Sequence, residues 1–229
     1  MATSGTTAFT LDLTEVVEEA FERAGAELRS GYDLRTARRS LNLLFADWAN
    51  RGVNMWTIEQ GSVPLVAGTA TYTLPVDTVD LLDHVVRTND GVTALQTDIS
   101  ITRISMPTYS SIPNKLTEGR PIQLYIERLN TPQFTVWPVP ETGSSYTLVY
   151  WRLRRMLDAG NGAHPMDMPF RFLPAMIAGL AYYLALKVPD GMARLDVLKQ
   201  QYDEVWQLAS GEDRERAAVR FVPRQAFIG

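Results

Sequence analysis

The chain has 229 residues, of which 45% are hydrophobic and 21% charged, a composition typical of one or two soluble globular domains. It contains no cysteine, which excludes disulfides, thiolate metal sites and cysteine nucleophiles. The formal net charge of −4 argues against a protein whose main role is to wrap nucleic acid, because that role requires a basic surface. The most apolar run, residues 172–186, is shorter than the ~20 residues that a membrane span needs, and it predicts a buried core helix.

Two amphipathic helices are predicted at the start of the chain. Apolar residues recur at three- and four-residue spacing over residues 13–28, and again in the segment that leads to Gly52. Asp12, followed three residues later by Glu15, has the pattern of a capping box. For the second helix we expect Asp33 as the N-cap and Gly52 as the left-handed residue that ends it. The short linker between the helices predicts an antiparallel helical hairpin.

The middle of the chain has the alternation and the turn residues of short β-strands. Asn89-Asp90-Gly91 is a strong hairpin signal, and it predicts that the strands on either side of it pair. A short helical turn is expected at residues 104–110. The whole series predicts a meander that closes into a small sandwich or an open barrel. The expected strands are residues 57–65, 71–74, 84–88, 92–96, 122–128, 134–138 and 146–154.

Two further helices are predicted near the end of the chain. Residues 170–186 are apolar almost all round, which favours a helix at the centre of the helical layer, with Pro174 either kinking it or marking its first turn. A fourth helix is expected over residues 192–210, and helical periodicity is lost from Gly211 onward.

The predicted fold class is α+β. It comprises a four-helix layer formed by the two ends of the chain, an inserted antiparallel β sandwich or barrel-like section, and an extended C-terminal tail. The expected domains are a helical bundle of residues 10–55 and 165–211, an inserted β domain of residues 56–158, and a C-terminal interaction arm of residues 212–229.

No catalytic or metal-binding motif is present, and we expect no cofactor. His84 and His164 occur without a nucleophile elbow or a zinc-binding pattern, so a surface or hydrogen-bonded histidine is the simpler interpretation. Paired carboxylates would suit glycoside hydrolysis, but 26 acidic residues supply some such pair in any chain of this size. The conceivable pairs are Glu15 with Glu19 and Glu59 with Asp77.

Charged residues line the polar faces of the first two helices. The simpler interpretation is a solvated face with intrahelical ion pairs, each worth only a few tenths of a kcal/mol. The functional alternative is a contact between the basic helix of one subunit and the acidic helix of the next. The candidate subunit-interface residues are Glu15, Glu18, Glu19 and Glu22 on the first helix, and Arg35, Arg38 and Arg39 on the second.

Aromatic residues divide into two groups. The five tryptophans mostly occupy inward-facing periodic positions, and we expect them in the core. The aromatic residues of the tail lie in a segment with no core of its own, which is typical of an arm that wraps onto a partner. The candidate partner-binding residues of the arm are Arg220, Phe221, Val222, Pro223, Arg224, Phe227 and Ile228.

Several stretches resemble a known protein family. They are ARRSLNLLFADWANRGVNMWTIEQGSVPL at residues 37–65, TYTLP at residues 71–75, SIPNKLTEGRPIQLY at residues 111–125 and FTVWPVP at residues 134–140. With them, the chain from the first to the fourth helix resembles the head-to-tail adaptor proteins of short-tailed phages, which include the tail tubular protein A and packaged-DNA-stabilisation groups.

The resemblance implies a structural protein of the virion neck that is assembled in the host cytoplasm. It implies a ring, typically of twelve copies, that docks below the portal protein, extends the DNA channel and gives the tail nozzle protein a platform. The arm would bind the portal, and the β section would face the next tail component. DNA would pass through the lumen without specific binding, which suits a net-negative chain because a basic lumen would hold the phosphates.

Two other functions stay open on the sequence alone. One is a tail-associated enzyme that cleaves peptidoglycan with two carboxylates. The other is a β-rich receptor- or sugar-binding module with helical support, which would require exposed aromatic residues on the β section.

Overall fold

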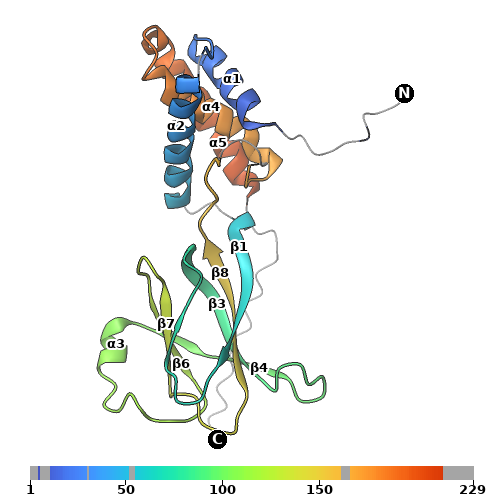
Figure 1. The fold of residues 1–229 in the computed structure, drawn as a ribbon, viewed down its shortest axis with the longest axis vertical. Helices are drawn as coiled ribbons and strands as arrows, with labels where there is room; N and C mark the ends of the chain where they lie inside the picture. The colour runs from blue at the N-terminus through green and yellow to red at the C-terminus, as the bar shows by residue number, and fades with distance from the viewer. Residues whose placement is uncertain (1–4, 6–10, 30, 52–54, 161–165, 214–229) are drawn as a thin grey trace, which may run out of the picture. The chain divides into compact units, whose positions relative to one another are not determined.

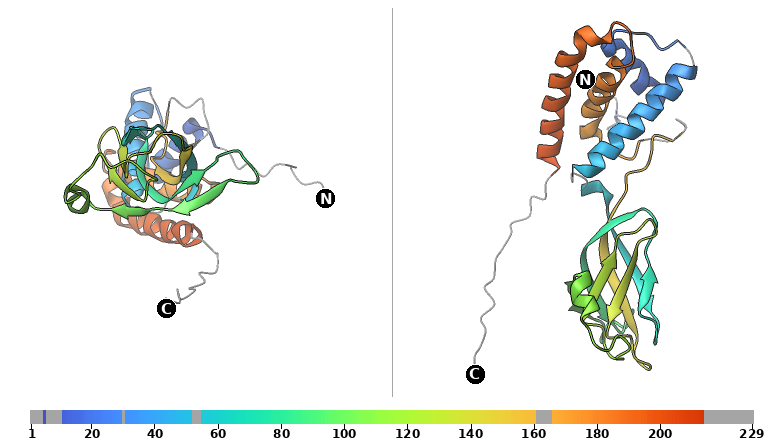
Figure 2. Two further views of the ribbon diagram at one scale, coloured as in Figure 1. Left: turned by 90° about the horizontal axis from the view of Figure 1, so that it is seen from below. Right: turned by 90° about the vertical axis from the view of Figure 1, so that its left-hand side faces the viewer.

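The computed structural model describes residues 5, 11–29, 31–51, 55–160 and 166–213 (Figures 1 and 2). It combines helices with two largely antiparallel sheets, which confirms the predicted α+β class. The chain divides into two compact units. The helical unit is drawn from Met1–Met55 and Asp158–Gly229, and the β unit is Trp56–Leu157.

The described part of the helical unit contains four main helices and two short 3-10 turns. The helices are α1 (Leu13–Ala24), α2 (Gly31–Asn50), α4 (Leu173–Ala185) and α5 (Leu195–Glu212), and the turns are η2 (Phe170–Phe172) and η3 (Gly191–Arg194). None of the helices in the described part of the chain combines the length and the apolar composition that crossing a bilayer requires.

Helix α4 is the centre of the helical unit, as its all-round apolar sequence predicts. All three other helices pack on it, and most of its residues are buried. Pro174 lies in the first turn, where a missing N–H costs no hydrogen bond, so it starts the helix and does not kink it. Gly179 allows close packing here, because a Cβ at this position would lie 2.9 Å from both Leu44 and Tyr202.

Aromatic side chains fill the space between α2, α4 and α5. Trp48 is fully buried, and its indole nitrogen donates a hydrogen bond of 2.7 Å to the hydroxyl of Tyr202. The ring centroids of Trp48 and Trp206 are 4.7 Å apart. Phe172 packs against both tryptophans, and the guanidinium of Arg51 lies over the Trp206 ring. The tryptophans outside this cluster (Trp56, Trp137 and Trp151) are only half-buried.

The ends of the first two helices differ from the prediction. Helix α1 ends at Ala24 and not at residue 28, because Gly25 adopts a left-handed conformation with φ 86° and caps it. Helix α2 begins at Gly31, so Asp33 lies in its first turn and is not the N-cap; its carboxylate accepts a hydrogen bond from the amide of Arg29. The predicted cap Gly52 lies outside the described residues.

The C-terminal end of α5 is fixed by a buried carboxylate. Helix α5 runs to Glu212, two residues beyond the predicted end. The side chain of Asp213 is fully buried, pairs with Arg171, and accepts a hydrogen bond of 3.1 Å from the backbone amide of Met55. Asp213 therefore ties together three segments of the helical unit that are far apart in the sequence.

The β unit contains eight strands and one short helix. After the 3-10 turn η1 (Met55–Thr57), the strands are β1 (Ile58–Leu65), β2 (Thr71–Thr73), β3 (Thr78–Thr88), β4 (Thr97–Ser100), β5 (Thr102–Ile104), β6 (Gln123–Glu127), β7 (Gln133–Trp137) and β8 (Tyr146–Arg154). The helical turn predicted at residues 104–110 is present as α3 (Met106–Ser110), with Ser105 as its N-cap and Pro107 in its first turn.

The strands form a two-layer sandwich. One sheet has the order β1-β8-β3-β4, and the other has the order β2-β7-β6-β5 with β5 parallel to β6. Both sheets contribute to one core, in which Leu81, Leu148, Leu124 and Phe134 are almost fully buried. The predicted meander is wrong, because the chain changes sheet four times between β1 and β8.

The hairpin around Asn89 also differs from the prediction. Strand β3 pairs with β4, which starts only at Thr97, so residues 92–96 are not the partner strand. They form turns instead: the amides of Leu95 and Gln96 both donate to the carbonyl of Val92. The left-handed conformations of Asn89 and Gly91 begin this longer loop.

Candidate functional site: charged helix faces and a groove in the helical unit

The four predicted glutamates of α1 fall into two pairs with different surroundings. Glu15 closes the capping box, and Glu19 forms an ion pair of 2.7 Å with Arg23. Glu18 and Glu22 are exposed, lie one turn apart, and form no ion pair with any described residue. Only Glu18 and Glu22 therefore present free carboxylates, and we call them the acidic face.

The predicted arginines of α2 divide in the same way. Arg38 is half-buried and donates a hydrogen bond of 3.2 Å to the carbonyl of Gly160. Arg39 is exposed and donates to the hydroxyl of Thr36, while Arg35 is exposed without an ion pair in the described part of the chain. The predicted trio is therefore one structural arginine and two outward-facing ones.

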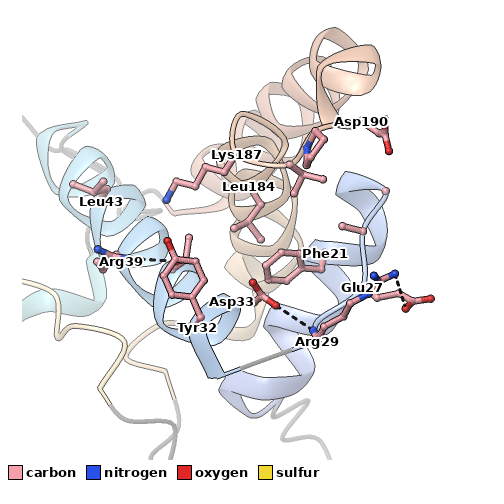
Figure 3. Close-up of a pocket in the computed structure, with 15 residues that line it drawn as sticks. Phe21, Glu27, Arg29, Tyr32, Asp33, Arg39, Leu43, Leu184, Lys187 and Asp190 are labelled. Carbon is pink, nitrogen blue, oxygen red and sulfur yellow. Dashed lines mark hydrogen bonds and ion pairs between the residues drawn. The ribbon is translucent and has the colours of Figure 1, made fainter.

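A groove lies beside this surface, within the helical unit (Figure 3). It has a volume of about 800 Å³ and is bordered by the C-terminal end of α1, the first half of α2 and the C-terminal end of α4. Phe21 and Leu184 form an apolar wall, and Leu43, which is 60% exposed, lies at the edge. A groove of this size and mixed lining can accept side chains of another molecule.

Two cations meet at one end of the groove, where Tyr32 also lies (Figure 3). Lys187, at the end of α4, donates a hydrogen bond of 2.6 Å to the hydroxyl of Ser40, which is fully buried in α2. Burial lowers the pKa of Lys187, and the positive charge of Arg39 lowers this pKa further. No described carboxylate forms an ion pair with either cation, so this end of the groove is suited to an anionic group.

The sequence comparison then identifies the kind of protein. A family model described as SU10 adaptor protein matches residues 11–224. The chain belongs to the SU10 adaptor protein family. It is thus a phage adaptor, a structural component of the virion. No curated protein matches this adaptor chain.

Some of the other predicted site residues of the adaptor lie outside the part of the chain that the structure describes. The portal-binding candidates, Arg220, Phe221, Val222, Pro223, Arg224, Phe227 and Ile228, lie outside the described residues, as does His164. Conversely, sequence reasoning missed Lys187, Ser40 and Tyr32 as members of a site. Lys187 and Ser40 are 147 residues apart, and no local pattern indicates that they meet.

The proposed catalytic carboxylates are held by arginines. Arg152 binds Glu59 at 2.8 Å and Asp77 at 2.6 Å, and Arg154 binds Glu59 at 2.6 Å. The hydrogen bond from Arg152 lowers the pKa of Asp77, which keeps this carboxylate ionised. A general acid needs a raised pKa, so Asp77 has the opposite of the required environment.

His84 has the surroundings of a core residue. It is 8% exposed, and neither ring nitrogen has a hydrogen-bond partner among the described residues. Burial lowers its pKa, so the imidazole is neutral near pH 7. Within the described ranges, no group of three or more histidine, aspartate and glutamate side chains is placed to hold a metal ion.

Proposed function

We propose that this adaptor forms a ring, typically of twelve copies, below the portal of a short-tailed phage. The ring would extend the DNA channel and provide the platform on which the tail nozzle docks, so that DNA passes through it during ejection. The observation that carries the proposal is the adaptor-family match over residues 11–224. The division into a helical unit and a β unit supports it, because two compact units can serve two neighbours.

Each part of the chain has one task in this proposal. The helical unit makes the contacts between subunits. The C-terminal arm, which includes Phe221 and Phe227, binds the portal protein through apolar contacts. The β unit meets the nozzle protein, and its exposed apolar residues Val92, Leu95 and Leu116 are candidates for that contact.

The enzymatic alternative receives no support from the carboxylates that suggested it. Glu15 and Glu19 are engaged within α1, and Glu59 and Asp77 are bound by arginines.

The sugar-binding alternative would need open aromatic surfaces on the β unit. The rings of Tyr109 and Tyr125 stack on each other there, and the ammonium of Lys115 lies over Tyr109.

Electron microscopy of the purified adaptor mixed with the portal protein of the same phage tests this function. We expect a ring of adaptor density at one end of the portal. A variant that lacks residues 220–229 should remain a folded monomer by circular dichroism and fail to assemble on the portal. Portals without any added density for the full chain would contradict the ring, and normal assembly of the truncated variant would contradict the role of the arm.

A further inference from the structure

The helical unit carries two sets of opposite charges that do not neutralise each other within one copy. Glu18 and Glu22 lie on the exposed side of α1, opposite the buried stripe that includes Val17, Ala20 and Ala24. Arg39 and Lys187 lie in the groove. No ion pair joins the two sets within one copy. A single copy thus presents an acidic surface and a cationic recess.

The cationic end of the groove is held in place before any partner binds. The hydrogen bond to buried Ser40 fixes the ammonium of Lys187 at the end of α4. Arg39 is fixed less tightly, through a hydrogen bond of 3.2 Å to Thr36 on its own helix. Two positive charges of the same protein in one recess repel each other, and a carboxylate placed between them relieves that repulsion.

The acidic residues that line the groove do not fill this role. Glu27 pairs with Arg29, and Asp33 accepts a hydrogen bond from the amide of Arg29. Asp190 lies at the other end of the groove from the ammonium of Lys187 (Figure 3). No carboxylate in the described part of the groove is thus available to Arg39 and Lys187, which favours an anion from another molecule.

We propose that the groove of one copy receives the acidic face, Glu18 and Glu22, of the next copy. This assignment rests on the proposed function, since it names the surfaces through which neighbouring subunits of the ring meet. The exposed side chains of Tyr32 and Leu43 add apolar area around the charged pair. Tyrosine and arginine together are typical of the energetic centre of a protein interface.

The geometry of the two surfaces determines the kind of assembly. They are different patches of the same chain, so a contact that uses one groove and one acidic face is head-to-tail. Such a contact closes into a ring when the rotation between copies allows it. The interface is thus consistent with a cyclic adaptor. A two-fold dimer would need both patches of each copy in one interface, with each groove on the other copy's acidic face, which leaves neither patch for a third copy.

Charge reversal with rescue tests the contact. One variant carries Glu18→Lys with Glu22→Lys, and a second carries Arg39→Glu with Lys187→Glu. Each variant alone should assemble on the portal at least about tenfold less than the wild type at low ionic strength, because like charges then face each other. An equimolar mixture should assemble, with the two variants alternating around the ring, and native mass spectrometry counts the copies of each.

Controls separate this contact from folding and from net charge. The control variant carries Lys199→Glu with Arg120→Glu, at two exposed positions outside the groove. It changes the net charge by the same amount as the groove variant, and it should assemble normally. Circular dichroism checks that each variant folds. If the variant with Arg39→Glu and Lys187→Glu does not fold, the neutral pair Arg39→Gln with Lys187→Gln replaces it. This neutral pair should weaken assembly, since the groove then attracts no carboxylate.

The outcomes distinguish the contact from the proposed function. A wild-type protein that forms no ring on the portal would overturn the proposed function itself. If the wild type formed rings and the groove variant assembled equally well, the subunit contact would be overturned. The same conclusion would follow if both variants folded but failed to rescue each other. If the groove variant assembled normally but lost binding to a DNA fragment, the groove would bind phosphate instead.

Discussion

Tyr202 joins two helices through a single hydroxyl. It accepts the hydrogen bond from Trp48, and the residue is only 3% exposed. Burial raises the pKa of Tyr202 to about 12, although the hydrogen bond from Trp48 acts in the opposite direction. The hydroxyl therefore stays protonated in the folded protein at a pH at which the unfolded chain releases the proton.

Replacement of this tyrosine should have an effect that depends on pH. At pH 8, Tyr202→Phe leaves the indole N–H of Trp48 without its partner, and we expect a loss of about 1–3 kcal/mol in the free energy of unfolding. The raised pKa means that the wild type loses stability as pH rises from 10 to about 12, by about 2–3 kcal/mol, because the unfolded state deprotonates first. The phenylalanine variant lacks this loss.

Urea denaturation of both proteins between pH 8 and 11.5 measures the difference. The stability gap between wild type and Tyr202→Phe should shrink above pH 10. Tyr32→Phe is the matched control at an exposed position, because Tyr32 is 63% exposed. A gap for Tyr202→Phe that does not change with pH would show that the buried hydroxyl does not titrate as described.

Helix α4 depends on the absence of a side chain at one position. Gly179→Ala would gain about 1 kcal/mol in helix propensity but place a methyl group 2.9 Å from Leu44 and Tyr202. Both neighbours are buried, and overpacking of this kind costs about 1–3 kcal/mol. We expect a net loss of about 1 kcal/mol in the free energy of unfolding, measured by thermal or chemical denaturation.

Gly211 in α5 provides the matched comparison. A Cβ there meets no atom within 4 Å, so Gly211→Ala should stabilise the protein by about 0.5 kcal/mol through helix propensity alone. If both substitutions were stabilising, the close packing of α4 against its neighbours would not limit the residue at position 179.

The elements that sequence reasoning found are those with a strong local signal. The buried run of α4 and the strand β8 were predictable because each carries its own apolar pattern. Residues 92–96 were misassigned because a turn signal specifies where a chain reverses and not how long the loop is. The parallel pairing of β5 with β6 was not predictable, since Thr102 and Gln123 are far apart in the chain and only the folded sheet aligns them.

The candidate site shows the same limit. Periodicity indicated that Arg35, Arg38 and Arg39 share one side of α2, but it gave no sign that Arg38 binds a backbone carbonyl from a distant segment. Lys187 is near the end of an apolar run, and its role depends on a hydrogen bond to a different helix. Residue types and their spacing predict which face of a helix carries charged side chains. Whether each of these side chains is free or has a partner depends on tertiary contacts.

At the scale of the whole molecule, the β unit has a core of its own. All the residues of the sandwich core, such as Leu65, Phe134 and Tyr150, come from within Trp56–Leu157. A fragment of about 100 residues with such a core is large enough to fold by itself. We therefore expect residues 56–157, expressed alone, to give a β-type circular dichroism spectrum and a single cooperative melting transition.

The full chain provides the reference for this fragment. The dispersed amide resonances of the isolated fragment should resemble those of the same residues in the full protein. A fragment that stays unfolded would mean that the sandwich depends on the helical unit for its stability.

The two ends of the β unit are paired with each other. Ile58 at the start of β1 lies opposite Leu153 near the end of β8, and the pairing continues along both strands. Loops elsewhere in the sandwich can lengthen, shorten or change their residues without separating these two ends. If the adaptor forms the proposed ring, we therefore expect the β unit to diverge among related phages together with its neighbour in the tail, and ring closure to keep the helical unit more constant.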